Sequence, residues 1–244
     1  KYALAKFRIT ENQSSNDLLI LNKDDQESMK YFGKIQTNAQ VIYTSTAEIN
    51  EETFTSNKGI TYDISECNLR GRHNQSNIAQ AIEALESIGL KKRAVESGIS
   101  TFQGLAHRLE FVANVDGVDY INDSKATNID SVWYALDAMK KPTVWIVGGI
   151  DKGNDYSILS ELVRNKVRWM ICMGLENQKL IDMFGHEVEG YDEAGSAQEA
   201  VLKAQKAATS GDVVLLSPAC SSFDLFKNYE DRGEQFKKAI KKLL

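Results

Sequence analysis

The sequence is poor in cysteine, proline and histidine. Its 244 residues include three cysteines, two prolines and three histidines. Cys67, Cys172 and Cys220 are odd in number and widely separated, and none of them stands in a CxxC or His/Cys pair. This pattern argues against a disulfide framework and against a zinc site. Scattered free thiols are typical of a reducing compartment, so the sequence predicts a cytoplasmic protein.

Long apolar runs and a basic excess are also absent. The apolar runs are far shorter than the roughly 18–20 residues that cross a bilayer, and the first residues do not have the pattern of a signal peptide. Twenty-nine Lys and Arg against 34 Asp and Glu give a net charge of −5, which argues against nonspecific nucleic-acid binding. We therefore expect neither a membrane nor a nucleic acid as partner, and we expect a monomer. The chain does not begin with Met, which fits a piece of a longer protein and fits equally a chain that was processed or had a tag removed.

The second half of the chain alternates between strand and helix patterns. An Asp116-Gly117 turn predicts a β-hairpin between 111–115 and 118–121. The remaining predicted strands are 144–147, 169–173 and 212–216, and the predicted helices are 129–139, 156–163, 178–184 and 196–208. This order predicts an α/β fold, a doubly wound Rossmann-like sheet over residues 106–244 with an antiparallel hairpin at its start.

Residues 1–105 have a different pattern of apolar residues. Short apolar runs at 18–21 and 41–43 predict short, partly antiparallel strands. Helical periodicity begins later and predicts helices over about 74–89 and 91–96. Residues 99–108 have little periodicity and read as a connection, so we place a domain boundary near residue 105.

The first stretch with unusual chemistry follows the second hairpin strand. Ile121-Asn122-Asp123-Ser124-Lys125-Ala126-Thr127-Asn128 packs a carboxylate, an ammonium and several hydroxyl or amide groups into eight residues. A plain helix N-cap at Thr127 or Asn128 is the structural alternative. A cap requires only one such residue and gives no reason for Asp123 and Lys125 together.

The second stretch is Val147-Gly148-Gly149-Ile150-Asp151-Lys152-Gly153, directly after a predicted strand. Glycines allow a ligand to approach the backbone, and Lys152 can bind phosphate or carboxylate as a point charge. The spacing fits neither a Walker A loop nor a GxGxxG dinucleotide fingerprint. A flexible turn with a solvated Lys152 is the alternative.

The third stretch runs from Leu215 to Gly233. A small-residue turn follows the last predicted strand, and Phe223, Phe226, Phe236 and Ile240 then fall at roughly helical intervals. Backbone N–H groups and the hydroxyls of this turn are suited to an anion. An ordinary loop with Ser221 or Ser222 as helix cap is the alternative. Because ligands bind beyond the carboxyl ends of parallel strands, we expect all three stretches to converge on one pocket.

Isolated histidines give a weaker signal. His73, His107 and His186 have no neighbours at metal-ligand spacing, and a lone His is more often structural than a ligand. Arg108 follows the predicted boundary, where it could reach a ligand or remain a solvated surface residue.

Together these stretches resemble the Mur ligase family. The resemblance rests on His107-Arg108-x-Glu110, the 121–128 stretch, Gly148-Gly149-x-Asp151-Lys152-Gly153, and the run from Leu216 to Gly233 that includes Ser217-Pro218-Ala219-Cys220. Gly71-Arg72-His73-Asn74-x-x-Asn77 is similar to a motif that Mur ligases share with folylpolyglutamate synthases. Because several motifs occur in the same order over about 71–233, the probability of a chance match is very small.

The resemblance implies an ATP-dependent ligase of bacterial peptidoglycan synthesis, within the cytoplasm. Residues 1–105 would be the latter part of a central ATP-binding domain, and 106–244 a C-terminal domain that receives the amino acid. The implied reaction joins D-glutamate to UDP-N-acetylmuramoyl-L-alanine through an acyl phosphate. The family's Gly-Thr-Asn-Gly-Lys-Thr/Ser phosphate-binding string and its magnesium ligands do not occur in this sequence, so we expect the chain to be inactive alone.

The resemblance also assigns roles to single residues. Lys125 and His107 would be catalytic, and Lys6, if carbamylated, would help to hold Mg²⁺. Asn77, Arg108 and Asp123 would contact ATP. The implied contacts to D-glutamate are Thr127, Lys152, Ser222, Phe223 and Tyr229.

The sequence also fits other functions. A nucleotide-binding α/β module, including a nucleotide-cofactor oxidoreductase, fits the same sheet, but no GxGxxG follows a strand. Another Mur-type or folylpolyglutamate-type ligase is a further alternative, as is a non-catalytic interaction module. The basic end 237–244 reads as a turn or two of solvated helix and not as a membrane-seeking segment.

Overall fold

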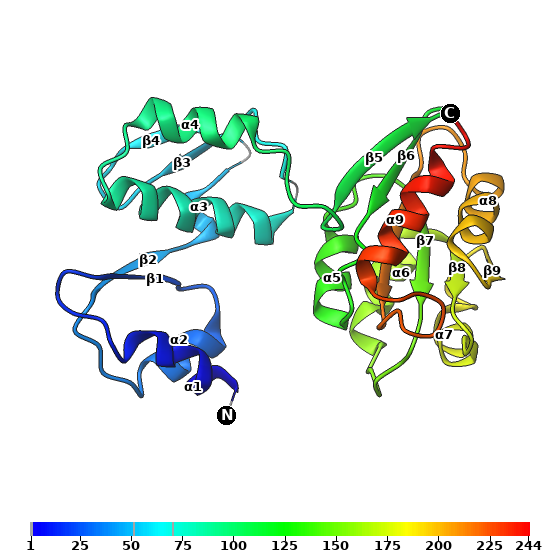
Figure 1. The fold of residues 1–244 in the computed structure, drawn as a ribbon, viewed down its shortest axis with the longest axis horizontal. Coiled ribbons are helices and arrows are strands. Elements are labelled where there is room, and N and C mark those ends of the chain that lie inside the picture. Colours follow the sequence, from blue (N-terminus) through cyan, green and yellow to red (C-terminus); the bar gives the residue numbers. More distant parts are fainter. Residues whose placement is uncertain (1, 51, 70) are drawn as a thin grey trace. The chain divides into compact units, whose positions relative to one another are not determined.

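The computed structural model describes residues 2–50, 52–69 and 71–244, with the side chains of Arg72 and His73 outside the description. The backbone contacts divide the chain into two compact units, Lys1–Gln103 and Gly104–Leu244 (Figure 1). The functional assignment of residues 1–105 and 106–244 to two domains stays a prediction.

The first unit contains two small sheets and a pair of longer helices. Strands β1 and β2 are parallel, and β3 and β4 form an antiparallel pair. The helices α3 and α4 pack on β3 and β4 around a core that includes Phe54, Tyr62 and Ile82. The elements are α1 Tyr2–Phe7, η1 Arg8–Thr10, β1 Leu18–Asn22, α2 Gln26–Phe32, β2 Gln40–Thr44, η2 Thr46–Glu48, β3 Thr53–Thr55, β4 Thr61–Asp63, α3 Arg72–Ser87 and α4 Lys92–Thr101.

Two expectations for this unit need correction, and one is confirmed. The sequence pattern did not predict α1 and α2; α2 is started by Asp25, whose carboxylate accepts hydrogen bonds from the backbone N–H groups of Glu27 and Ser28. The prediction of partly antiparallel strands is confirmed, since β3 and β4 are antiparallel, whereas β1 and β2 are parallel with α2 between them. Helix α4 extends to Thr101, so residues 99–101 are helical and not part of a connection.

The second unit is a six-stranded sheet in the order β5-β6-β10-β7-β8-β9, all within fully described residues. Only the β5–β6 hairpin is antiparallel. This architecture confirms the predicted doubly wound fold with a hairpin at its start. The elements are β5 Glu110–Val115, β6 Val118–Asn122, α5 Ile129–Asp137, β7 Thr143–Gly148, η3 Ser157–Leu159, α6 Ser160–Lys166, β8 Val167–Met173, α7 Gln178–Phe184, β9 Gly190–Ala194, α8 Ala197–Ala207, β10 Val213–Ala219 and α9 Tyr229–Ile240.

Alternation along each strand builds two separate cores. Trp145, Val147 and their neighbours point toward α5, α6 and α7, whereas Val144 and Ile146 point toward α8 and α9. Helix α9 crosses over this second face (red in Figure 1). Because both faces are covered, the central strands β7 and β10 are buried at every position. Among the described residues, no helix is both long and apolar enough to span a bilayer.

The last strand, β10, lies between β6 and β7. The carboxyl ends of these three parallel strands therefore meet at one edge of the sheet, where the order of strands reverses. Helix α9 begins only at Tyr229, where the Asn228 side chain accepts a hydrogen bond from the backbone N–H of Asp231. The interpretation of Ser221 or Ser222 as helix cap is therefore wrong, since a loop separates them from the helix. In the stretch after β6, Asn128 is the N-cap of α5, which agrees with the helix-cap alternative for Thr127 or Asn128.

Candidate functional site at the carboxyl edge of the sheet

The turns that follow β6, β7 and β10 are joined by backbone hydrogen bonds. The N–H of Ala219 donates to the carbonyl of Ala126 at 2.9 Å, and the N–H of Ile150 donates to the carbonyl of Ser221 at 2.9 Å. Gly149 allows the second contact, because a Cβ at this position would lie 2.3 Å from the Ser221 carbonyl oxygen. The three turns therefore form one continuous surface at the edge of the sheet.

This surface carries cationic, hydroxyl and aromatic groups. Lys152 is exposed and Thr127 is half-buried, while Ser222 is only 2% exposed. The carbonyl of Ser222 accepts hydrogen bonds from the N–H groups of Leu225 and Phe226, which closes the loop into a turn. Phe223 projects outward and is 69% exposed. Ammonium and hydroxyl donors of this kind are suited to carboxylate or phosphate oxygens.

Lys125 lies against an aromatic ring. Its Nζ is 5.1 Å from the ring centroid of Tyr229, at the start of α9, which is within cation–π range. The backbone carbonyl of Tyr229 accepts a hydrogen bond of 2.7 Å from the Ser124 hydroxyl. This hydrogen bond links Ser124, which precedes Lys125, to Tyr229, whose ring lies near the Lys125 ammonium.

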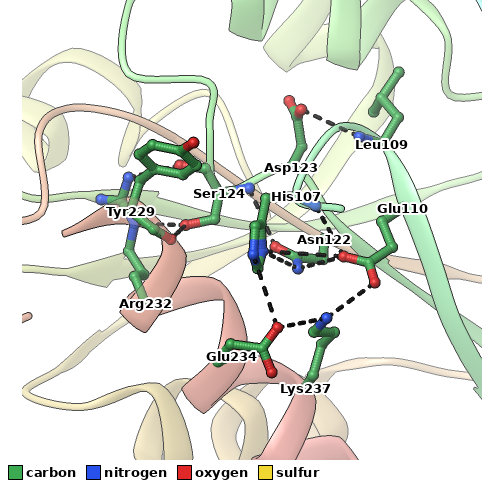
Figure 2. A network of polar contacts seen from close by, with 10 residues as sticks. All are labelled: His107, Leu109, Glu110, Asn122, Asp123, Ser124, Tyr229, Arg232, Glu234 and Lys237. Carbon is green, nitrogen blue, oxygen red and sulfur yellow. Dashed lines mark hydrogen bonds and ion pairs between the residues drawn. The ribbon is translucent and has the colours of Figure 1, made fainter. Parts of the chain in front are cut away.

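A buried arginine holds two of the turns together. Arg232 on α9 is 1% exposed, and its guanidinium donates to Ser124 Oγ at 3.0 Å and to the Ser124 carbonyl at 2.8 Å (Figure 2). The same group donates to the carbonyl of Cys220 at 3.2 Å. Burial lowers the pKa of Arg232 to about 10. Sequence reasoning gave Arg232 no role, although it stands in the quoted motif from Leu216 to Gly233.

His107 is packed into a polar network beneath α9 (Figure 2). The imidazole is 7% exposed, and its Nδ1 lies 3.0 Å from the amide nitrogen of Asn122. The Asn122 oxygen accepts the N–H of Ser124, so the amide nitrogen faces His107 and donates to Nδ1. The other ring nitrogen, Nε2, lies 3.8 Å from a carboxylate oxygen of Glu234. The ring also meets the edge of Tyr229 at 6.0 Å between centroids.

Glu110 completes this network. One carboxylate oxygen accepts from the Asn122 amide at 2.9 Å and from the backbone N–H of His107 at 2.9 Å, while the other pairs with Lys237 of α9 at 3.1 Å. Gly233 provides the room, because a Cβ there would lie 2.2 Å from His107 Nδ1. These contacts hold the His107 side chain in a fixed position. The prediction that it is catalytic is neither supported nor contradicted by these contacts.

Asp123 is the most perturbed carboxyl group at this edge. It is 7% exposed; one oxygen accepts from Leu109 N–H at 3.2 Å and the other from the Ser217 hydroxyl at 2.9 Å. Burial raises the pKa of Asp123 to about 7, against the lowering effect of these hydrogen bonds and of Arg108. Close to neutral pH, both forms of Asp123 are therefore populated: the ionised carboxylate, which only accepts hydrogen bonds, and the protonated carboxyl, which can also donate one.

Comparison with known proteins shows which family the chain resembles. Residues 107–220 match the family model described as Mur ligase, glutamate ligase domain. A protein of Christiangramia forsetii named UDP-N-acetylmuramoylalanine–D-glutamate ligase is 41% identical over 252 residues, covering 99% of this chain and 57% of the relative. The protein of the same name from Cytophaga hutchinsonii is 43% identical over 250 residues, covering 98% of this chain and 56% of the relative. Residues 107–220 are therefore similar to the glutamate ligase domain of Mur ligases, and almost the whole chain is similar to these relatives.

The chain spans a little over half the length of these Mur ligase relatives. Solved structures agree in fold. MurF from Acinetobacter baumannii superposes with a TM-score of 0.70 at 15% identity, over 99% of this chain and 55% of that one. Folylpolyglutamate synthase from Thermotoga maritima does so with a TM-score of 0.63 at 16% identity, over 96% of this chain and 57% of that one.

The remaining residues suggested by the Mur ligase resemblance lie at the surface. Arg108 is exposed just after the start of the second unit. In the first unit, Asn77 is exposed on α3, and Lys6 is exposed on α1 with its Nζ 5.3 Å from the ring centroid of Tyr2. Within the described residues, no group of three or more His, Cys, Asp or Glu side chains is placed to hold a metal ion.

Proposed function

We propose that the protein to which this chain belongs is an ATP-dependent ligase that joins D-glutamate to UDP-N-acetylmuramoyl-L-alanine, and that residues 106–244 receive the D-glutamate. The proposal places the chain in cytoplasmic peptidoglycan precursor synthesis. It rests on relatives named UDP-N-acetylmuramoylalanine–D-glutamate ligase that are 41% and 43% identical over almost the whole chain. The observation that carries the amino-acid site is the hydrogen-bonded junction of the three turns after β6, β7 and β10.

The amino-acid substrate sets clear demands on this junction. D-Glutamate carries two carboxylates beside its amine, so its site must supply several fixed donors. In the proposal Lys152 and Thr127 bind one carboxylate, and the Ser222 hydroxyl with the backbone of Phe223 binds the other. Tyr229 packs alongside, with its ring close to the Lys125 ammonium. Such a set orients the amine for attack and would discriminate against the opposite stereoisomer.

Lys125 and His107 are proposed for the chemistry. The exposed ammonium of Lys125 would stabilise negative charge that develops at the reacting centre. His107 would hold the Lys125 turn, since its backbone carbonyl accepts the N–H of Lys125 at 3.1 Å. When bound, ATP would supply the phosphoryl group that makes the substrate carboxylate reactive as an acyl phosphate.

Arg108, Asp123 and Asn77 are proposed contacts to ATP. Each oxygen of Asp123 already accepts one hydrogen bond, and each keeps a second lone pair for a ribose hydroxyl. Mg²⁺ is a different case. Because the described residues contain no cluster of three or more candidate metal ligands, they do not form a magnesium site by themselves. Lys6, if carbamylated, would contribute a single oxygen-bearing group.

Calorimetric titration of D-glutamate into this chain tests the amino-acid site. We expect binding of D-glutamate, at least tenfold weaker binding of L-glutamate, and a loss of at least tenfold in affinity for Lys152→Ala. Lys206→Ala removes an exposed lysine of α8 and should leave the affinity within twofold. In the full-length protein, Lys152→Ala should raise the apparent KM for D-glutamate steeply.

Two results would refute the proposal. Equal affinity of the Lys152→Ala and Lys206→Ala variants for D-glutamate would remove the second turn from the site. Ligation of L-glutamate in preference to D-glutamate by the full-length protein would point instead to another Mur-type or folylpolyglutamate-type ligase.

A further inference from the structure

A cavity of about 510 Å³ opens at the opposite edge of the sheet, at the amino-terminal ends of β7 and β8. Its walls are the segment 139–142, which leads into β7, the segment 164–168, which leads into β8, and Glu189 before β9. The three turns of the candidate site follow the carboxyl ends of the strands. The cavity is therefore a separate feature of the second unit. Its volume lies within the roughly 300–1,000 Å³ of typical small-molecule sites.

Basic side chains dominate the lining. Five of the lining residues are cationic and one is a carboxylate: Lys140, Lys141, Arg164, Lys166, Arg168 and Glu189. The chain as a whole carries a net charge of −5, so this gathering of cations runs against the average of the surface. Four carboxylates, Asp119, Glu187, Glu189 and Asp212, pair with three of these cations, and the lining offers an anion the cationic N–H donors that these pairs leave over.

Most of these cations already have carboxylate partners. Lys141 pairs with Asp119 at 2.6 Å and Arg164 with Glu187 at 3.1 Å; the basic side chains are 47% and 58% exposed, and the carboxylates 15% and 9%. An ammonium has three N–H donors and a guanidinium has five, so each cation has more donors than its carboxylate partner takes. Both can therefore contact an incoming anion while they stay paired with their carboxylates. Arg168, with Asp212 and Glu189 as partners, stays fixed in the wall.

Lys166 adds a charge whose described partners are backbone carbonyls. Its ammonium donates to the carbonyls of Leu136, at 3.1 Å, and Asp137, the last residues of α5. This contact caps the carboxyl end of the helix. An ammonium has three N–H donors, so one donor remains for a ligand in the cavity. The side chain is half-buried, which holds the ammonium in place.

We propose that this cavity binds a small organic polyanion, a molecule with at least two phosphate or carboxylate groups. Lys141 and Arg164 would contact the anionic groups from the two segments, and Lys166 would contact them from the floor. A single monovalent anion would engage only one of these positions, whereas a diphosphate can bridge two. The site lies outside the proposed ligase chemistry and does not depend on it.

Titration of inorganic pyrophosphate into this chain at low ionic strength tests the proposal, with calorimetry as the readout. We expect one binding event, weakened at least tenfold in the double variant Lys141→Gln/Arg164→Gln. The matched control is Lys203→Gln/Lys206→Gln on α8, which changes the net charge by the same amount and should keep the affinity within twofold. Inorganic phosphate should bind at least tenfold more weakly than pyrophosphate.

Three outcomes would overturn the proposal. Equal weakening in both double variants would mean nonspecific attraction to positive charge. Loss of binding in Lys152→Ala, with the affinity of Lys141→Gln/Arg164→Gln unchanged, would place the anion at the carboxyl edge. Undetectable pyrophosphate binding at millimolar concentration and low salt would dismiss the site.

Discussion

Arg232 and Ser124 are joined by two hydrogen bonds in the interior of the second unit, from Nε to the hydroxyl oxygen at 3.0 Å and from Nη2 to the carbonyl oxygen at 2.8 Å. The two residues are 108 positions apart in sequence, on α9 and on the turn after β6. Because Arg232 also donates to the carbonyl of Cys220, it fixes the first and third turns to the same helix. The planar guanidinium is suited to this task, since its donors point in fixed directions.

Arg232→Met should destabilise the second unit by about 2–4 kcal/mol, because hydrogen bonds from a charged donor are lost and buried carbonyls are left without partners. All three tryptophans, Trp133, Trp145 and Trp169, lie in this unit, so tryptophan fluorescence in a urea titration reports on it. Lys206→Met, at an exposed position of α8, should stay within about 0.5 kcal/mol. A loss of less than 1 kcal/mol in Arg232→Met would show that the turns hold without the clamp.

Asp123 predicts a pH dependence of stability. Its folded-state pKa of about 7 exceeds the ordinary value of 3.8, so the folded state binds the proton more tightly than the unfolded state. The resulting stabilisation is complete below about pH 4 and is lost as the pH rises through about 7. Three pKa units correspond to about 4 kcal/mol as an upper limit.

Asp123→Asn removes this titration and keeps the shape of the side chain. Because all other titrating groups are shared, the stability of the variant minus that of the parent, measured by urea unfolding, should rise between about pH 4.5 and about pH 7.5. Relative to the parent, the variant should gain stability at the higher pH. An identical pH dependence in both proteins would show that Asp123 is not protonated more readily in the folded state.

Two substitutions of Tyr229 distinguish the contribution of its ring, which lies near Lys125, from that of its hydroxyl. In the full-length protein, Tyr229→Leu should lower kcat/KM for D-glutamate about 2- to 5-fold, as expected for the loss of about 0.5–1 kcal/mol of cation–π energy. Tyr229→Phe keeps the ring and should remain within about twofold of the parent. A larger loss in Tyr229→Phe than in Tyr229→Leu would assign the effect to the hydroxyl and remove the ring from this role.

Much of the second unit could be predicted because its strands are buried on both faces. Apolar runs such as 144–147 and 169–173 give a strong local signal, and Asp116-Gly117 marks the hairpin directly. Strand β9 was missed because it lies at the sheet edge and reads Gly190-Tyr191-Asp192-Glu193-Ala194, with polar residues facing solvent. In the first unit, α1 and α2 have six and seven residues and bury none of them, so they leave no apolar period by which the sequence could identify a helix.

The site could be predicted only in part, for a similar reason. The three turns were found because each follows a strong strand signal and ligands gather at the carboxyl ends of strands. Arg232 was not found, since its partners are a hydroxyl and backbone carbonyls of distant turns, which leave no pattern in the sequence. The helix cap was misplaced because Ser221 and Ser222 looked like cap residues, whereas the chain runs on to Asn228 before α9 begins.

Gly233 and His107 offer a test of the polar network beneath α9. A Cβ at residue 233 would lie 2.2 Å from His107 Nδ1, so Gly233→Ala should displace the imidazole and cost about 1–3 kcal/mol in unfolding free energy despite the better helix propensity of alanine. The control is Gly98→Ala on α4, where nothing lies within 4 Å of the added Cβ; it should be neutral or stabilising by up to about 1 kcal/mol. Because the first unit contains no tryptophan, far-UV circular dichroism follows the unfolding of this control.

A double-mutant cycle with His107→Ala decides whether the clash is the cause. If the imidazole is what the new methyl group meets, Gly233→Ala should cost at least about 1 kcal/mol less in the His107→Ala background than in the parent. Urea titrations of the four proteins, followed by tryptophan fluorescence, measure this coupling. Additive losses would mean that the methyl group is resisted by the backbone of α9 or by Asn122, whose amide nitrogen lies 3.1 Å from the same point. His107 would then be held by its hydrogen bonds alone, without the tight packing that Gly233 permits.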